Sequence, residues 1–165
     1  MNFTEELTAV GGKVFTAPDV AAARDYIERL VAEKGGPVLA ARRPAVEKLG
    51  LRGVEWHGDR PLAEARIGVT QADYALADTG TLVVFSSAGE GRALSLLPPI
   101  HVAVLEESRI LAGLDELLAH EPDFPSRSSA MIFITGPSRT ADIEKTLTVG
   151  VHGPGELHVV LLSAL

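Results

Sequence analysis

Polar residues that can bind an anion lie near the carboxyl terminus, between two apolar segments. The stretch "ITGPSRTADIEKTLTVGVHGPGELHVVLL" places Ser138, Arg139 and Thr140 directly after a Gly-Pro turn that begins at Gly136. An arginine beside free backbone amides is a good receptor for a carboxylate or a phosphate, because its planar fork matches both groups. The stretch therefore indicates an anion-binding site built on this turn.

Acidic residues and a histidine follow the same turn. If a helix starts here, Asp142 and Glu144 lie within its first two turns, where they suit the helix dipole but repel a second negative charge. A polar, solvated helix start is therefore the alternative to a binding site. His152, in the loop "GVHGP", titrates near neutral pH and can transfer a proton, or it can be an ordinary loop histidine. Both readings stay open for each residue.

A second group of polar residues lies in "ADTGTLVVFSSAGEGR". The hydroxyls of Thr79 and Thr81 can line a site, or they can belong to a hairpin corner at which Gly80 takes a positive φ. Ser86 and Arg92 flank a glycine-rich loop that resembles a phosphate-binding loop only loosely. The loop lacks the lysine of a P-loop and the spacing of the dinucleotide fingerprint.

The chain shows no pattern of metal ligands. It contains no cysteine, which excludes disulfides, thiolate zinc sites and cysteine-held iron–sulfur clusters. Its histidines lack the close helical spacing of a ligand set. We therefore predict no metal and no cofactor in this chain. The histidines are His57, His101, His120, His152 and His158.

Composition and charge narrow the class of protein. The 165 residues, 46% of them hydrophobic, suit one compact domain over residues 1–165. The 15 basic and 22 acidic residues give a net charge of −7, which argues against nucleic acid and anionic membranes as partners. The amino terminus lacks the apolar stretch of a secretory signal, and no apolar run is long enough to span a bilayer. We expect a cytoplasmic protein.

The elements that must position these residues follow an α/β rhythm. "PDVAAARDYIERLVAEKGG" has helical spacing, with Pro18 at its first turn and Gly35 at its stop, and short apolar runs flank it. Apolar runs at residues 75–77 and 82–85 predict an antiparallel hairpin. The predicted fold class is α/β, a mainly parallel sheet flanked by helices with an inserted antiparallel hairpin. Further strands are expected in "KVFT", "PVLAA", "VEWH", "IHVAVLEE", "AMIFITG" and "ELHVVLL".

The expected fold suggests where a ligand would bind. In an open α/β sheet, ligands bind beyond the carboxyl ends of the strands, because helix N-termini and loop amides converge there. Since "ITGPSRT" follows an expected strand, we expect it at that edge, together with the loops of Thr79, Arg92 and His152.

The order of three motifs closely resembles the LUD domain family, whose members serve lactate utilisation. The motifs are "ADYALADTGTLV", "GRALSLLPPIHVAVL" and "ITGPSRTADIEKTLTVGVHGPGELHVVLL", so the resemblance runs from about Arg66 to the carboxyl terminus. Before Arg66 it rests on generic segments such as "EELTAVGGKVF". Compared with the family, the helical lead at the amino terminus is expected to be short.

The resemblance implies a fold similar to sugar-phosphate isomerases and coenzyme A transferases. It also implies a part in oxidising L-lactate to pyruvate beside iron–sulfur partner proteins, with a small carboxylate or phosphorylated ligand at the loops. A homo-oligomer is compatible with this role. Two alternatives stay open: a non-catalytic assembly protein without a small-molecule site, and an acyl or coenzyme A transferase-like enzyme.

Overall fold

The largest of the three β-sheets in the described residues is parallel and contains six strands. The computed structural model describes residues 2–87, 92–141, 147–149 and 152–163. Within them, the strands of the first sheet lie in the order β1-β12-β7-β4-β2-β3, and every pair is parallel. The strands are β1 (Lys13–Ala17), β2 (Val38–Ala40), β3 (Glu55–Trp56), β4 (Ile67–Gln71), β7 (Ile100–Glu106) and β12 (Glu156–Leu162).

The second sheet is mixed and contains the predicted hairpin. Its order is β8-β5-β6-β9, with β5 and β6 antiparallel, β6 and β9 antiparallel, and β5 and β8 parallel. The strands are β5 (Tyr74–Leu76), β6 (Thr81–Phe85), β8 (Ile110–Leu111) and β9 (Met131–Ile134).

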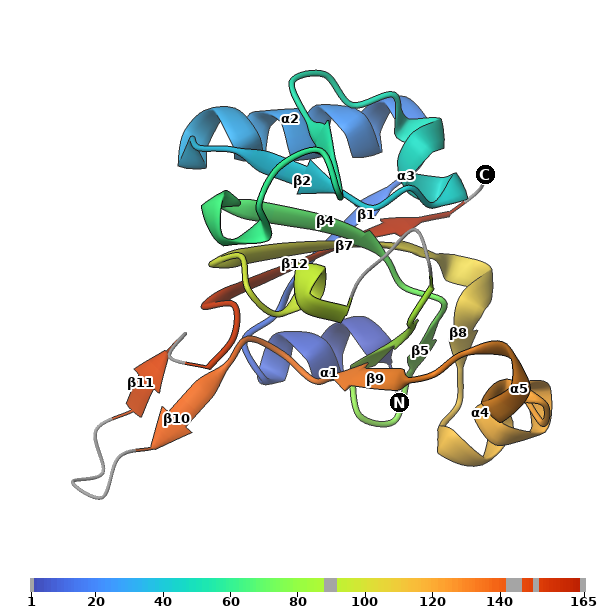
Figure 1. Ribbon diagram of the computed structural model, residues 1–165. Coiled ribbons are helices and arrows are strands. Elements are labelled where there is room, and N and C mark those ends of the chain that lie inside the picture. Colours follow the sequence, from blue (N-terminus) through green and yellow to red (C-terminus); the bar gives the residue numbers. More distant parts are fainter. Residues whose placement is uncertain (1, 88–91, 142–146, 150–151, 164–165) are drawn as a thin grey trace.

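Helices cover both faces of the parallel sheet. Figure 1 shows α2 (Val20–Lys34) and α3 (Pro44–Leu49) on one face, and α1 (Phe3–Ala9) with the second sheet on the other. The other helical segments are η1 (Leu62–Glu64), η2 (Arg92–Ser95), η3 (Glu107–Arg109), α4 (Leu114–His120) and α5 (Phe124–Arg127). Among the described residues, no helix has the length and apolar composition needed to cross a membrane.

In helix α2, the local sequence determines where the helix begins, which face is buried and where the helix ends. The Asp19 side chain accepts a hydrogen bond from Ala22 N at 2.8 Å and caps the first turn. The buried face carries Ala23, Ile27 and Leu30 at helical spacing. Gly35 ends the helix with a φ of +66°, as its position in the sequence predicts.

Two layers of apolar side chains hold the fold together. One lies between the parallel sheet and α2, and includes Ile27, Val69 and Val160. The other lies between the two sheets, where Leu7 of α1 and Leu82 of β6 are buried with residues of β7 and β12. The second sheet and α1 are therefore attached to the first sheet by a continuous core.

The predicted α/β fold with its inserted hairpin is confirmed, but two local expectations differ. Strand β4 was not predicted, because "RIGVT" is short and contains Gly68. That glycine is required, since an added Cβ would overlap the Leu94 carbonyl oxygen of η2. The helix expected after the Gly136 turn is wrong. Instead, β10 (Arg139–Ala141) pairs antiparallel with β11 (Leu147–Val149) in a hairpin that stands away from the sheets (Figure 1).

The reason for that strand hairpin lies in the residue types. The segment is rich in β-branched residues, which favour an extended backbone. These residues are Thr140, Ile143, Thr146, Thr148 and Val149.

Candidate functional site

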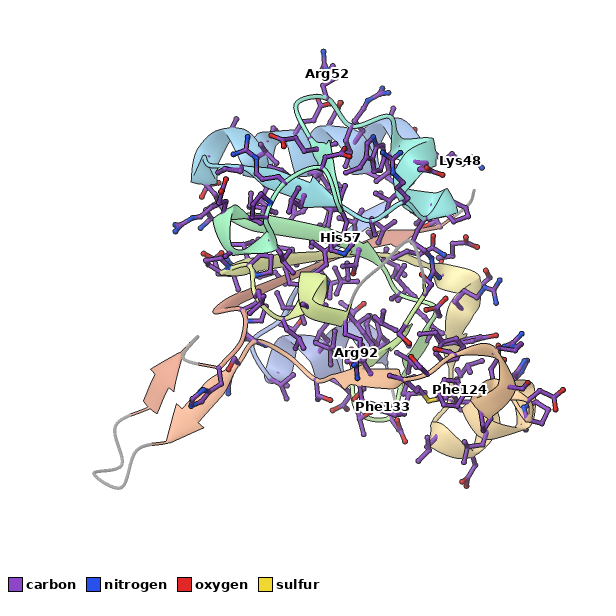
Figure 2. All side chains as sticks on the ribbon, in the orientation of Figure 1. Lys48, Arg52, His57, Arg92, Phe124 and Phe133 are labelled. Atoms are coloured by element: carbon purple, nitrogen blue, oxygen red, sulfur yellow. The ribbon has the colours of Figure 1, made fainter. Side chains whose placement is uncertain are left out.

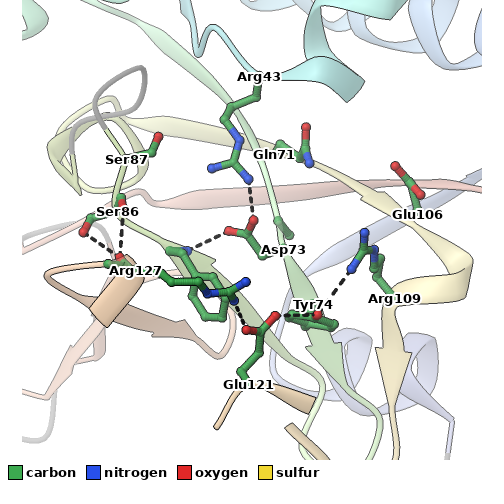
Figure 3. Close-up of a pocket in the computed structure, with 13 residues that line it drawn as sticks. Arg43, Gln71, Asp73, Tyr74, Ser86, Ser87, Glu106, Arg109, Glu121 and Arg127 are labelled. Atoms are coloured by element: carbon green, nitrogen blue, oxygen red, sulfur yellow. Dashed lines mark hydrogen bonds and ion pairs between the residues drawn. The ribbon is translucent and has the colours of Figure 1, made fainter. Parts of the chain in front are cut away.

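A cleft of about 330 Å³ lies at the carboxyl ends of β2, β4 and β7, and we call it the carboxyl-end cleft (Figure 3). The second sheet and α5 close its other side. Its described lining residues are Arg43, Gln71, Ala72, Asp73, Tyr74, Phe85, Ser86, Ser87, Glu106, Arg109, Glu121, Arg127 and Ser128.

Part of the lining is a framework that fixes the loops. The Asp73 carboxylate accepts hydrogen bonds from the Arg43 guanidinium and, at 2.7 Å, from Phe85 N. The Gln71 side-chain oxygen accepts from Ala45 N at 2.9 Å, in the first turn of α3. These contacts join the loop after β2, the loop after β4 and the end of β6, so the cleft has a fixed rim.

A second set of contacts centres on Tyr74. Its hydroxyl donates to Glu121 Oε1 at 2.7 Å and accepts from Arg109 Nη1 at 3.2 Å. The Arg109 guanidinium also lies over the Tyr74 ring, with 5.4 Å from its central carbon to the ring centroid. Glu121 is further paired with Arg127. The phenol is therefore held between an acidic and a basic side chain.

Arg109 is the cation that this arrangement leaves for a ligand. Of the three arginines in the cleft, Arg43 and Arg127 pair with carboxylates, whereas Arg109 forms no ion pair with any carboxylate in the described part of the chain. A guanidinium has five N–H donors, and one contact to Tyr74 leaves most of them available. Glu106 lines the same wall as Arg109 and has no hydrogen-bond partner in the described ranges (Figure 3). Among the described residues, the cleft thus offers one guanidinium with free donors and one carboxylate without a hydrogen-bond partner.

Among the predicted site residues that the structure describes, Ser86 alone lines this cleft. Its hydroxyl is 3.0 Å from the hydroxyls of Ser128 and Ser129. Ser87 lines the cleft beside it. The glycine-rich loop that follows, residues 88–91, lies outside the described residues.

Four other predicted residues meet in a different place. Gly136, Ser138, Arg139 and His152 line a cavity of about 320 Å³ at the amino ends of β7 and β12, which we call the amino-end cavity. The expectation that they lie beyond the carboxyl ends is wrong. The turn follows β9, and β9 belongs to the second sheet, which delivers the turn to the opposite end of the parallel strands.

The amides of that turn are partly occupied. Ser138 N donates to the carbonyl oxygen of Pro154 at 2.8 Å, so it is not available to an anion. The Arg139 guanidinium donates one hydrogen bond to the carbonyl oxygen of Val10 and is otherwise exposed. Thr140 lies in β10, whereas Asp142 and Glu144 fall outside the described residues.

The remaining predicted residues are at the hairpin corner or on the surface. The Thr79 and Thr81 hydroxyls are 2.8 Å apart, and Thr81 is 2.7 Å from the hydroxyl of Thr135. Gly80 has a φ of +64°, as predicted, and lies against the backbone of α1. Arg92 is exposed and lines neither the cleft nor the cavity. Within the described ranges, no group of acidic and histidine side chains is placed to hold a metal ion.

Most of the cleft residues were not singled out from the sequence, although some carried a signal. Arg43, Asp73 and Glu106 are polar residues directly at or after parallel strands, where a ligand is expected. Arg109 and Glu121 come from segments that only the tertiary structure brings to the cleft.

Comparison with known proteins decides the family. Residues 59–162 match the LUD domain. The chain belongs to the LUD domain family. Arg43 precedes the matched range, whereas Asp73, Arg109 and Glu121 lie within it.

Named relatives extend the similarity to most of this LUD domain chain. It is 33% identical to lactate utilization protein C of Bacillus subtilis, covering 86% of the chain and 68% of that protein. For lactate utilization protein C of Anoxybacillus flavithermus the identity is 32%, covering 90% and 74%. The chain spans less of others, such as 41% of the Shouchella clausii protein at 42% identity.

A solved structure shares the fold. The crystal structure of a DUF162 family protein from Deinococcus radiodurans superimposes with a TM-score of 0.73 at 22% identity, and the match covers 98% of this chain and 94% of that one. At this identity the similarity describes the fold alone.

Proposed function

We propose that this LUD domain chain serves lactate utilisation and binds a small hydroxy- or oxo-carboxylate in the carboxyl-end cleft. The observation that carries the proposal is Arg109, a cation without a carboxylate partner among the described residues, in a cleft at the carboxyl ends of parallel strands. The relatives named lactate utilization protein C support the choice of a carboxylate over other anions.

The contacts suggest a role for each side chain. The free donors of Arg109 bind the ligand carboxylate, since a guanidinium can grip both oxygens at once. Tyr74 holds Arg109 in place through its hydroxyl and its ring. Glu106 accepts a hydrogen bond from the ligand hydroxyl, because its carboxylate is unpartnered in the described ranges and lies on the same wall.

Isothermal titration calorimetry with L-lactate and with pyruvate tests this site. We expect Arg109→Gln to weaken binding of both by about tenfold, the loss of one charge-assisted contact. Arg52→Gln is the matched control, because Arg52 has an 81% exposed side chain, pairs with Glu28 and projects from the α2 side of the molecule (Figure 2). Equal affinities for the parent and Arg109→Gln, or no binding by the parent, would contradict the proposed site.

The partner proteins form a second part of the proposal. Oxidation of a hydroxy acid to an oxo acid releases two electrons and two protons, and this chain has no cysteine with which to hold an iron–sulfur cluster. We therefore place the clusters in partner proteins. Purification of the chain from lactate-grown cells is expected to recover iron-containing proteins at fixed stoichiometry. Their recovery without any ligand binding by the chain would favour a purely assembling role instead.

A further inference from the structure

The amino-end cavity differs from the carboxyl-end cleft in its chemistry. It lies at the opposite end of β7 and β12, between the parallel sheet, β9 and η2, and encloses about 320 Å³. His101 at the start of β7 and Leu157 at the start of β12 line its inner side. A molecule bound there would not overlap one bound in the cleft.

His101 leaves an unsatisfied polar atom beside this cavity. The side chain is fully buried, and its Nε2 is 2.8 Å from the Thr70 hydroxyl, whereas its Nδ1 has no hydrogen-bond partner. In the tautomer in which Thr70 donates to Nε2, Nδ1 carries the ring proton and needs an acceptor. Buried polar atoms are almost always hydrogen-bonded, so Nδ1 is a donor that a group bound in the cavity could satisfy.

Apolar side chains form one part of the cavity wall. Ile132, Ile134 and Leu157 line it, and so do two large side chains that are unusually exposed. These are Leu96, which is 44% exposed, and Phe133, which is 46% exposed. Both would lose contact with water if an apolar group entered beside them, which favours binding of such a group.

The described lining of the cavity carries a basic side chain and no acidic one. No aspartate or glutamate is found among its described lining residues, although the chain carries a net charge of −7. The ionisable side chains there are Arg139, His101 and His152. Arg139 keeps guanidinium donors beyond the one used on Val10. An anion is therefore the charged group that this cavity suits.

We propose that the amino-end cavity is a second ligand site, which binds an amphipathic organic acid. The apolar body of the acid lies against Ile132, Phe133 and Leu157, and its carboxylate accepts a hydrogen bond from Arg139. Because His101 is fully buried, the carboxylate reaches Nδ1 of His101 when the side chains that cover this atom move aside. This assignment satisfies the orphan nitrogen and covers the exposed apolar rim in one step. The proposed site uses no residue of the carboxyl-end cleft. A test of it therefore does not depend on whether the cleft binds lactate.

Calorimetric titration of the full chain with octanoate tests the site, with acetate as the control of equal charge and little apolar surface. We expect one octanoate per chain, bound at least about tenfold more tightly than acetate, because each buried methylene adds to binding. Arg139→Gln is expected to weaken octanoate binding about tenfold, and Phe133→Ser to weaken it severalfold. Arg52→Gln is expected to leave it unchanged, because Arg52 pairs with Glu28 and lines neither the cavity nor the cleft.

His101→Phe removes the orphan nitrogen while keeping a ring, and we expect it to weaken octanoate binding as well. If this buried variant fails to fold, Arg139→Gln and Phe133→Ser still test octanoate binding, because both residues are exposed. The proposal is overturned if the parent binds octanoate no better than acetate, or if both exposed variants bind octanoate like the parent.

Discussion

Gly80 joins the second sheet to helix α1 at a point where no side chain fits. Its φ is +64°, and an added Cβ would overlap the backbone nitrogen of Leu7. Gly80→Ala therefore combines backbone strain with a clash against main-chain atoms that cannot rotate away. We expect a loss of at least about 1–3 kcal/mol in the free energy of unfolding, measured by urea denaturation.

Gly50 provides the control for Gly80. It ends α3 with a φ of +59°, but an added Cβ there would meet nothing within 4 Å. Gly50→Ala therefore measures the strain alone, and we expect it to cost clearly less than Gly80→Ala. An equal loss in the free energy of unfolding for the two variants would mean that α1 shifts to make room for a side chain at position 80.

Single residues were predictable from the sequence where local chemistry dictates the structure. The positive φ of Gly80 follows from a turn between two apolar runs, and the stop at Gly35 follows from helical spacing. Arg109 gave no local signal, because its proposed role depends on Tyr74 and on the absence of an acidic partner in the described residues. Such a pairing is a property of the folded chain.

At the scale of elements, Glu156 ties three of them together at the amino end of the parallel sheet. Its carboxylate, at the start of β12, accepts from Lys13 Nζ of β1 at 3.0 Å and from Lys34 Nζ of α2 at 2.9 Å. His158 Nε2 lies 3.2 Å from the same carboxylate. Hydrogen bonds from Lys34, Lys13 and His158 lower the pKa of Glu156 from 4.5 to about 2, against an opposing effect of burial.

The lowered pKa of Glu156 predicts a dependence of stability on acid. Between about pH 4.5 and 2 the unfolded chain binds a proton at this position and the folded chain does not, so stability is lost as the pH falls. We expect Glu156→Gln to be less stable than the parent at pH 7 and to lose less stability between pH 5 and 3, as followed by urea denaturation. Glu33→Gln serves as the control, because Glu33 also lies beside Lys34 but has a side chain that is 72% exposed. Parallel pH profiles for the parent and Glu156→Gln would contradict the prediction.

Elements were predictable where periodicity and turn residues agree, and not where one glycine interrupts a short strand. Helix α2 and strands β7 and β12 follow their sequence patterns closely. Strand β4 is central in the sheet, yet Gly68 conceals it, because the close approach of η2 excludes a side chain there. The β10-β11 hairpin replaces an expected helix start because β-branched residues favour strands.

For the whole molecule, we expect the apolar layer between the two sheets to make them unfold together. Leu105 of β7 is fully buried in this layer, with Leu7 of α1 and Leu82 of β6. We expect Leu105→Ala to cost about 2–5 kcal/mol, while both sheets still unfold in one transition. Unfolding followed by circular dichroism measures the loss of stability. Native-state hydrogen exchange shows whether both sheets unfold in one transition.

An exposed leucine provides the comparison for Leu105. Leu118 on α4 is 53% exposed, and we expect Leu118→Ala to change the free energy of unfolding by less than about 0.5 kcal/mol. A separate, earlier transition of the second sheet in Leu105→Ala would show that the layer does not unite the two sheets.

The arrangement of the whole molecule was the least predictable from the sequence. The rule for open sheets favours the carboxyl ends, where the cleft lies, but chain order alone does not reveal which loops reach that edge. The turn at Gly136 follows a strand of the second sheet, and the placement of that sheet carries Arg139 to the other end.

Strand β7 runs from the amino-end cavity to the carboxyl-end cleft, with His101 near its start and Glu106 at its end. At about 3.3 Å per residue, these two positions are on the order of 16 Å apart. Reacting atoms must approach to about 3–3.5 Å, so molecules held at the two ends cannot exchange a group or a hydride directly. Any influence of one occupant on the other is thermodynamic linkage through a stiff strand, and without such coupling their stabilising effects simply add.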